Sequence, residues 1–585
     1  MFIRFGSFIH QAGYAIIKCP KIQIMNKLLI LFTIFLSLGR IQTPPSVFST
    51  NTGVEEANRI NPPDCVSVKD APYNAKGNGT TDDTDAIRKA FTDAAASVSK
   101  RCVYFPRGIY LIDPSVTKEM FVLKSNMSVR GEKNGLKGLS VLKIKDNSIQ
   151  AQPAGAFRAA LAEQMLLGGE NAENITVENM VFDGNYRGNR NQIDASYMET
   201  NLVNFALVKG LNIKNCAFMN AGIACLVLVQ CQNSDIHHNY ILDVGQGVHN
   251  GDAIQTNGCM KTNIFYNLLE NVGEGIFCQH RDFPAIADDT ATVFNNQINN
   301  LEANEASRIR DYIDPSVWPQ MQANSLVISG KAGRAIGSAI GILSNNAKVY
   351  GNKIRKHLGI NIQAAKLHGD LSTSNVEVWQ NKLLQNGKIP YLNRTTGQMI
   401  RNANGALTVS AVGQTVKNVF IHHNTVFGSF NSGVYLGLEQ KTNKANLDNI
   451  RIENNNIQGT CANTDAPVFK MAAVLFANIG FTDAANKNKY SRVTIKNNQL
   501  GYVRNYGFWF EPCMSEVRIV GNTFVGDKNA KINFAARSCL KEINQPNDFR
   551  QNELNCLLEP NGICIGCTST PANCSPNTLK CITCE

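Results

Sequence analysis

The chain has 585 residues, of which 43% are hydrophobic and 18% are charged, and its formal charge is +11. This composition excludes a disordered chain, collagen and a coiled coil, and no apolar run reaches the roughly 18–20 residues needed to cross a bilayer, which excludes a polytopic membrane protein. No dense Lys/Arg run occurs, so nucleic acid is a poor candidate partner; the charge falls to +6 without residues 1–43, and this mild excess suits an acidic polysaccharide or an ordinary solvated surface.

Residues 1–43 are predicted to hold an upstream extension followed by an export signal. Lys27 follows Met25, the expected start, and an apolar stretch runs from Leu28 to Leu38 before small and polar residues. This is the order of a secretory signal, and the apolar stretch is too short to span a bilayer. We therefore expect a secreted protein, with residues 44–62 as a linker; a short membrane anchor is the alternative.

A helix is predicted over residues 82–98. Its apolar residues fall on one helical face, and they are Ile87, Ala90, Phe91, Ala94 and Ala95. Thr84 or Asp85 can cap its start, where acidic residues suit the helix dipole. We expect the helix to cover the open end of the repeat array that follows.

The body of the chain repeats a pattern of alternating apolar residues, then Asn, one further residue and an apolar residue. Examples begin at Asn174 (Asn-Ile-Thr-Val-Glu-Asn-Met-Val-Phe) and at Asn418 (Asn-Val-Phe-Ile-His-His-Asn-Thr-Val). Each unit predicts two short strands around a polar turn, and the units must stack to bury their apolar faces. Asn tolerates left-handed turn geometry, and stacked Asn side chains can hydrogen-bond along the axis. A second signature, such as Gly275-Ile276 or Gly359-Ile360, marks a further turn.

These features predict an all-β fold, a single-stranded parallel β-helix of roughly ten coils over residues 63–545. The remaining residues, 546–585, form a Cys-rich tail. Loss of the export signal removes Cys19 and leaves 16 of the 17 cysteines, and in an oxidising compartment we expect the tail to be stapled by disulfides. Its two Cys-x-x-Cys pairs, 564/567 and 581/584, would suggest zinc in a cytosolic protein.

The sequence resembles the pectate-lyase-like superfamily in one stretch. Tyr73-Asn-Ala-Lys-Gly-Asn-Gly-Thr-Thr-Asp-Asp-Thr-Asp-Ala-Ile, followed by Val103-Tyr-Phe-Pro-Arg-Gly-Ile-Tyr-Leu-Ile, is similar to the N-terminal segment of that superfamily. The resemblance implies a right-handed β-helix with its functional groove along one outer sheet. It leaves the reaction open, because one fold hosts many functions.

Two acidic residues are predicted to stack on neighbouring coils. Asn250-Gly-Asp-Ala-Ile-Gln and Val272-Gly-Glu-Gly-Ile-Phe align at a spacing of 22 residues. Asp252 and Glu274 would then lie on adjacent strands, whose backbones are about 4.8 Å apart. Two carboxylates that close repel, so one is expected to keep its proton, which suits the acid and base roles of glycoside hydrolysis. Turn acids that cap backbone N–H groups are the alternative.

The pair is partly similar to the motifs of polygalacturonases, which carry Asn-Thr-Asp-Gly and then Asp-Asp one coil later. Here Asn250 and Asp252 stand in the first motif, but Gly273 and Glu274 replace the second. The later Gly-His-Gly motif of that family is missing. We therefore expect a related polysaccharide-cleaving site, with Asp252 and Glu274 as catalytic residues.

A second group of candidates surrounds the pair. His280 and Arg281 are expected near the same coil, where, with His249, they could serve a uronate lyase or epimerase as base and cation. The residues expected to bind substrate are His249, Asn250, Gln255, Gln279 and Asp282. No metal ligand is assigned, although Asp282, Asp288 and Asp289 could form a Ca²⁺ cluster.

The expected function is therefore hydrolysis of glycosidic bonds in a polysaccharide, which could be acidic. The alternatives are a uronate lyase or epimerase, and a non-catalytic glycan-binding surface protein. Two stretches break the repeat, at about 300–335 and 385–416, and Trp318 in the first is expected to anchor the loop. His237-His238 and His422-His423 are expected to be strand residues, one of each pair pointing inwards, and residues around His357 could extend the groove.

Overall fold

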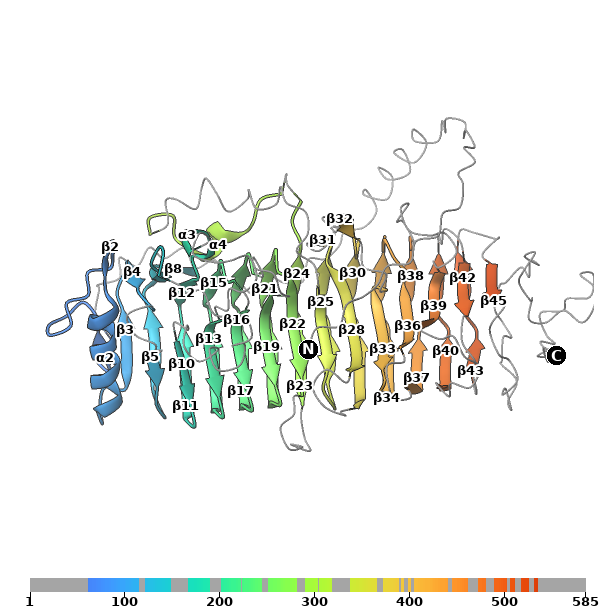
Figure 1. The fold of residues 1–585 in the computed structure, drawn as a ribbon, viewed down its shortest axis with the longest axis horizontal. Coiled ribbons are helices and arrows are strands. Elements are labelled where there is room, and N and C mark those ends of the chain that lie inside the picture. The colour runs from blue at the N-terminus through green and yellow to red at the C-terminus, as the bar shows by residue number, and fades with distance from the viewer. Residues whose placement is uncertain are drawn as a thin grey trace, which may run out of the picture. The chain divides into compact units, whose positions relative to one another are not determined.

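Three long parallel sheets form the fold, and successive coils of the chain contribute one strand to each sheet. Figure 1 shows these strands lying side by side from the blue to the red end of the colour bar. The structure is a computed structural model that describes residues 62–534, apart from 115–120, 149–166, 190–200, 223, 245–250, 281–289, 303–304, 318–336, 366–371, 389–390, 394–397, 401–404, 440–444, 461–471, 480–488, 502–505, 511–516 and 526–530.

Each sheet is named here by a letter, and its strands are given in chain order. Sheet A contains β1 (Cys65–Ser67), β3 (Cys102–Phe105), β6 (Ser128–Gly131), β11 (Glu173–Glu178), β14 (Lys209–Lys214), β17 (Gln232–His237), β20 (Met260–Phe265), β23 (Ala291–Phe294), β26 (Lys348–Tyr350), β29 (Thr373–Trp379), β34 (Thr415–His422), β37 (Asn446–Glu453), β40 (Lys489–Lys496) and β43 (Val517–Val520). Sheet B contains β2 (Asn78–Asp82), β4 (Gly108–Ile112), β9 (Ser140–Ile144), β12 (Met180–Asp183), β15 (Ala217–Met219), β18 (Tyr240–Leu242), β21 (Leu268–Glu270), β24 (Gln297–Asn299), β27 (Lys353–Arg355), β30 (Lys382–Leu384), β35 (Thr425–Phe427), β38 (Asn456–Gln458), β41 (Gln499–Gly501) and β44 (Thr523–Val525).

Sheet C contains β5 (Phe121–Leu123), β10 (Leu167–Glu170), β13 (Asn201–Ala206), β16 (Ala224–Val229), β19 (Asp252–Asn257), β22 (Glu274–Gln279), β25 (Ser338–Leu343), β28 (Leu358–Ala365), β33 (Leu407–Val412), β36 (Val434–Glu439), β39 (Ala472–Ile479), β42 (Tyr506–Phe510) and β45 (Lys531–Phe534). Two short antiparallel pairs lie outside these sheets, β7 (Lys133–Asn134) with β8 (Lys137–Gly138) and β31 (Tyr391–Asn393) with β32 (Gln398–Ile400). The described helices are α2 (Thr84–Ala96), α3 (Tyr186–Asn189) and α4 (Ile309–Tyr312).

The predicted parallel β-helix is confirmed, but it has more coils than predicted. Sheets A and B each hold 14 strands, against the roughly ten coils that the Asn pattern indicated. The first strands, β1 and β3, are not followed by the Asn of the repeat pattern, so a count based on that pattern misses them. None of the described helices is long and apolar enough to cross a membrane.

A corner at the start of each sheet C strand explains the Gly-Ile signature. Two consecutive residues face the apolar core there, as Ala253 and Ile254 do, both fully buried. At the equivalent place one coil later, a Cβ on Gly275 would lie 2.2 Å from the carbonyl oxygen of Ala339 and 3.2 Å from Ile298 Cδ1. Gly275 therefore leaves no room for a side chain, although Leu202 occupies the equivalent inward position three coils earlier.

A column of buried Asn side chains fills the turn between sheets A and B, as predicted. At Asn381 the side-chain amide donates to the carbonyl oxygens of Val349 (3.0 Å) and Trp379 (3.0 Å) and to Asn424 Oδ1 (2.9 Å). The equivalent bonds join the other members of the column, which are Asn239, Asn267, Asn296, Asn352, Asn424, Asn455, Asn498 and Asn522. Each buried amide is thus satisfied by its neighbours along the axis.

Helix α2 forms within the predicted range and covers the first coils. Ile87, Ala90, Phe91 and Ala94 are buried in the main core, and Ala95 packs against it. The N-cap is Asp83 rather than Thr84 or Asp85. The Asp82 carboxylate accepts from the Thr84 backbone N–H at 3.0 Å, while Asp83 accepts from the backbone of Lys76 and Gly77 at 2.6 and 2.9 Å.

Aromatic rings stack along the outer face of sheet A. Their centroids lie 4.4 to 6.0 Å apart in a continuous series that consists of His237, Phe265, Phe294, Tyr350, Trp379 and His422. His238 and His423 have positive φ and are exposed. The prediction that one His of each pair points inwards is therefore wrong, because the left-handed residue turns the chain so that the following Asn enters the core.

Candidate functional site

Asp252 and Glu274 are direct register partners at the start of β19 and β22. Their predicted stacking on adjacent coils is confirmed, since no insertion interrupts the single coil between them. Both side chains are largely buried, with 8% and 7% of their surface exposed. When two carboxyl groups are held this way on neighbouring strands, we expect the pair to carry one negative charge rather than two, because like charges repel.

Both acids face the outside of the β-helix rather than its core. The residue after each one is the inward corner residue, Ala253 or Gly275, so the acid itself points away from the apolar column. A Cβ on Gly341, which lies on the outer face of β25, would stand 3.4 Å from Glu274 Oε1. The carboxylates therefore lie where a bound polymer could reach them from outside the core.

The Glu274 carboxylate rests against the backbone of the next coil. The Ser338 N–H donates to Glu274 Oε1 over 3.4 Å, a long contact. A Cβ on Gly337 would lie 2.5 Å from Glu274 Cδ. Glycine at 337 therefore makes room for the acid, and its backbone fixes where the carboxylate sits.

His357 supports the turn that carries Glu274. Its side chain is completely buried, with Nε2 3.0 Å from the Val272 carbonyl oxygen and Nδ1 3.2 Å from that of Leu358. Burial lowers the pKa of His357 to about 4, so the ring is neutral near pH 7 and donates to one of the two carbonyls. His357 therefore braces the turn and does not extend an outer groove as predicted; its neighbours in that prediction, Lys366, His368 and Asp370, lie outside the described residues.

Gln255 and Gln279 lie on the outer face of sheet C, on the strands that begin with the two acids, and Gln279 is at the far end of its strand. Gln279 Nε2 donates to Asn257 Oδ1 at 2.5 Å, and Gln255 Nε2 lies 3.4 Å from the same oxygen. Asn257 was not anticipated as a site residue, because only the register of β19 with β22 places its amide between the two glutamines. These side chains form an amide cluster on the strands that begin with Asp252 and Glu274.

Phe277 is a further site residue that the sequence did not single out. Its ring lies over Gly341 on the next coil, where a Cβ would meet ring carbons Cδ2 and Cε2 at 2.3 and 2.6 Å. Phe277 is partly buried against Leu343 and Val412. The ring and the Glu274 carboxylate thus flank the same glycine.

His280 lies at the opposite end of β22 from Glu274. Six residues separate the two along an extended strand, which is about 20 Å. The backbone N–H of His280 donates to the Leu343 carbonyl oxygen at 3.1 Å, and burial lowers the pKa of its imidazole. His280 therefore belongs to the same coil as Glu274, as expected, but lies beyond the far end of its strand. Several other candidates lie outside the described residues, namely His249, Asn250, Arg281, Asp282, Asp288 and Asp289.

The first predicted insertion folds back over sheet B. Ile309, Ile313 and Val317 pack on an apolar cluster of that sheet, and Tyr312 stacks on Tyr240 with ring centroids 4.5 Å apart. Trp318 lies outside the described residues. In the second insertion, the described strands β33 and β34 resume the coil before its predicted end at residue 416.

Ion pairs hold the insertion at the turn after sheet B. The nearly buried Lys356 ammonium lies 2.8 Å from both Glu302 Oε1 and Glu305 Oε1. Arg355 pairs with Glu305 at 2.7 Å, and Lys388 pairs with Glu302. Burial alone would raise the pKa of Glu305, but hydrogen bonds from Lys356, the Glu302 backbone and Arg355 lower it to about 2.

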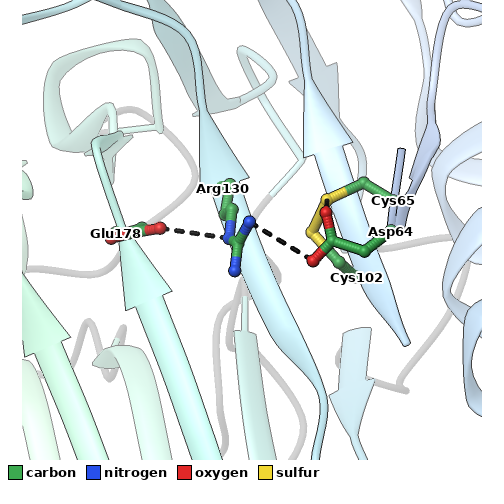
Figure 2. Close-up of a disulfide and its surroundings, with 5 residues drawn as sticks. All are labelled: Asp64, Cys65, Cys102, Arg130 and Glu178. Atoms are coloured by element: carbon green, nitrogen blue, oxygen red, sulfur yellow. Dashed lines mark hydrogen bonds and ion pairs between the residues drawn. A yellow bond between two sulfur atoms is a disulfide. The ribbon is translucent and has the colours of Figure 1, made fainter. Parts of the chain in front are cut away.

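Among the described residues, one group of three potential metal ligands lies close together, namely Asp64, Cys65 and Cys102. The two cysteines form a disulfide between neighbouring strands β1 and β3, so neither offers a thiolate. Figure 2 shows that Asp64 instead faces Arg130, which also pairs with Glu178 at 3.1 Å. This group is therefore a structural staple and not a metal site. The tail cysteines and residues 1–43 lie outside the described residues.

Comparisons with known proteins place one part of the chain in a sequence family. Residues 65–155 match the family model described as "Rhamnogalacturonase A/epimerase, pectate lyase-like". The chain is 32% identical over 133 residues to alginate lyase 7 of Azotobacter vinelandii, a match that covers 22% of this chain and 14% of the relative.

Solved structures with a similar chain course share little sequence with it. The A-module of mannuronan C-5 epimerase AlgE6 from Azotobacter vinelandii is 16% identical, covers 84% of this chain and 99% of its own, and has a TM-score of 0.43. The Streptococcus pneumoniae surface protein and adhesin PfbA is 12% identical over 80% of this chain and 99% of its own, with a TM-score of 0.42. The catalytic unit of a GH87 α-1,3-glucanase from Streptomyces thermodiastaticus is 16% identical. The match covers 75% of this chain and 69% of the glucanase chain, with a TM-score of 0.46. Residues 65–155 are thus similar to a pectate-lyase-like family, and the three parallel sheets show that the described chain is a parallel β-helix.

Proposed function

We propose that this protein hydrolyses glycosidic bonds in a polysaccharide, with Asp252 and Glu274 as the paired carboxylates. The observation that carries the proposal is their register on β19 and β22, on the outer side of the β-helix. One carboxyl would protonate the leaving oxygen, and the other carboxylate would activate water or attack the sugar directly. The similarity of residues 65–155 to polysaccharide-active proteins supports the same class of substrate.

The surroundings of Glu274 suit a proton-holding role. Its carboxylate packs against Gly337 and Ser338 and lies on the same side of sheet C as the Asp252 carboxylate. A carboxyl that is screened from water and close to a second acid keeps its proton to higher pH than a solvated one. We therefore expect one acid of this similarly buried pair to act as the general acid while the other stays ionised.

The test is the activity of two isosteric variants. Asp252→Asn and Glu274→Gln should each lower the release of reducing ends by roughly 100-fold or more, since removal of a catalytic acid or base costs at least that much, with circular dichroism unchanged. Glu170→Gln is the matched control, because Glu170 is an exposed acid at the end of β10 in the same sheet. Full activity in both site variants would remove the proposal.

Product analysis separates the competing reactions. A hydrolase releases reducing ends without new ultraviolet absorbance, whereas a uronate lyase creates an unsaturated, absorbing product. An epimerase changes the sugar composition without cleavage, and an adhesin binds without turnover. The uronate reactions were assigned to His280, whose distance from the acids of about 20 Å along the strand gives them no support at the carboxylate pair.

We also propose that the protein is secreted. The Cys65–Cys102 disulfide supports an oxidising compartment, as does the export signal expected within residues 1–43. Expression in a eukaryotic secretory host, with detection of the chain in medium or in cells, tests this directly.

A further inference from the structure

The outer face of sheet C carries amides on the strands that begin with the proposed catalytic pair, and the buried Asn257 and Gln279 lie about 17 Å from the acids along these strands. Gln255, Asn257 and Gln279 form one cluster, and Asn361 Nδ2 lies 3.4 Å from Gln363 Oε1 on β28, two coils further along. The buried Asn361 Oδ1 has no hydrogen-bond partner within the described part of the chain. Each amide offers two donors and an acceptor, which is the pattern that sugar hydroxyls can satisfy.

An aromatic ring lies between these two groups of amides. The ring carbons Cδ2 and Cε2 of Phe277 lie where a Cβ on Gly341 would stand, so β25 closely approaches the ring. The side chain remains partly exposed. A ring held in this way beside Glu274 can pack against the apolar C–H face of a sugar, because flat aromatic rings contribute large contact area at low entropic cost.

The charge of sheet C argues against a polyanionic substrate. Among the sheet C residues whose side chains the structure describes, the acids are Glu170, Asp252 and Glu274, and there is no Lys or Arg. A uronate polymer carries a carboxylate on every sugar and would meet like charge along these strands. The exposed, register-paired Lys353 and Lys382 lie on sheet B instead.

From this arrangement we infer that the site takes a neutral, hydroxyl-rich glycan, with the sugar at the cleavage point stacked on Phe277 and its neighbours held by the amides. The inference rests on the proposed function, because it takes the carboxylate pair as the place of cleavage. It differs from the sequence-based expectation that the substrate could be acidic.

Binding, measured separately from cleavage, tests this inference. Wild-type protein and Asp252→Asn are run by affinity electrophoresis through gels that contain neutral glucans, mannans or arabinans, or polygalacturonate or alginate. We expect retardation by at least one neutral glycan, unchanged at about 0.5 M salt, where charge interactions are screened within a few ångströms. Retardation by polyuronates alone, lost in salt, or by none of the polysaccharides, would overturn the inference.

Variants of the ring make the test specific to this face. Phe277→Leu keeps the apolar packing on Leu343 and Val412 but removes the flat ring, and should weaken neutral-glycan binding about tenfold, or about 1.4 kcal/mol. Phe427→Ala, at a 49% exposed ring on sheet B, is the matched control and should bind as wild type. Equal binding by wild type and Phe277→Leu would contradict the stacking. Binding can be measured without turnover. A wrong assignment of the glycan class can therefore be distinguished from a wrong assignment of the catalytic carboxylates.

Discussion

Single residues at the sheet C corner decide how closely adjacent coils approach. Gly359 and Ala339 occupy equivalent places on neighbouring strands, since Ile340 and Ile360 are register partners. A Cβ on Gly359 would stand only 1.6 Å from the Ala406 carbonyl oxygen. The same position thus tolerates Ala in one coil and excludes it in the next, because the local distance to the following backbone differs.

This difference predicts that stability depends on side-chain size much more strongly at position 359 than at position 339. Gly359→Ala should destabilise the protein by roughly 1–3 kcal/mol, since the added methyl group forces the backbone of β33 to move. Ala339→Gly, the matched control, should cost roughly 1 kcal/mol or less. Chemical denaturation followed by circular dichroism measures both, and a Gly359→Ala protein as stable as wild type would refute the steric account.

The carboxylate pair could be predicted from the sequence, while the rest of its site could not. Asp252 and Glu274 are 22 residues apart in a coil without insertions. Counting residues was therefore sufficient to predict that they lie on adjacent strands. Phe277 and Gly341 come from neighbouring strands, but a long insertion separates them in sequence. Nothing in the residues themselves reveals that their coils are adjacent. His280 lies in the same coil as Glu274, as the sequence indicated, but position in a coil does not give the distance along the strand.

At the scale of elements, the repeat pattern was informative where Asn filled the turn and silent elsewhere. The helix predicted over 82–98 forms as α2, Thr84–Ala96, because its apolar face has a core to cover. Strand β3 lies in the stretch that resembles the pectate-lyase-like superfamily, but the Asn pattern did not indicate β1 or β3 because their turns use other residues. The fold of the first insertion could not be predicted, because α4 is only four residues long and depends on contacts with sheet B.

The ionic anchor of that insertion predicts a dependence on pH. The pKa of Glu305 lies near 2 in the folded protein, against 4.5 for an ordinary glutamate. A lowered carboxyl pKa stabilises the fold above the unfolded value, and the contribution disappears as the pH falls from about 4.5 towards 2. The thermal stability of the wild type should therefore drop between about pH 5 and pH 2 in part through this anchor.

Lys356→Met isolates the anchor from other acidic groups. The variant should lose roughly 1–3 kcal/mol of its free energy of unfolding at about pH 6, because the buried ammonium group bonds both Glu302 and Glu305. At about pH 2 its stability should approach that of the wild type. Melting curves of the two proteins across this range measure the effect, and a constant difference between them would contradict it.

At the scale of the whole molecule, the Asn column couples coils that are distant in sequence. It runs from Asn239 to Asn522, and each member bonds the next. Buried amides that lose a partner are costly. The column therefore disfavours partial opening in the middle of the stack, where a separation of two coils would leave several polar groups unsatisfied.

An interruption at the centre of the column tests this coupling. Asn381→Ala should destabilise the protein by roughly 2–4 kcal/mol, because it leaves the backbone carbonyl oxygens of Val349 and Trp379 without their donor. Asn375→Gly is the control, since Asn375 belongs to an exposed Asn series and has a φ of 57°, which glycine also adopts. Asn375→Gly should lose less than roughly 1 kcal/mol of stability. Equal losses of stability in both variants would argue against a stabilising role of the buried Asn column.

The ring series on sheet A gives the molecule an internal optical signal. Trp379 is held nearly parallel to Tyr350, with 4.4 Å between ring centroids and 17° between the ring planes. Chromophores fixed in this way on successive coils produce circular dichroism in the near ultraviolet, which vanishes when side chains lose their fixed packing. The stacking of the central coils can thus be followed by light alone, without a label, a substrate or any knowledge of the reaction.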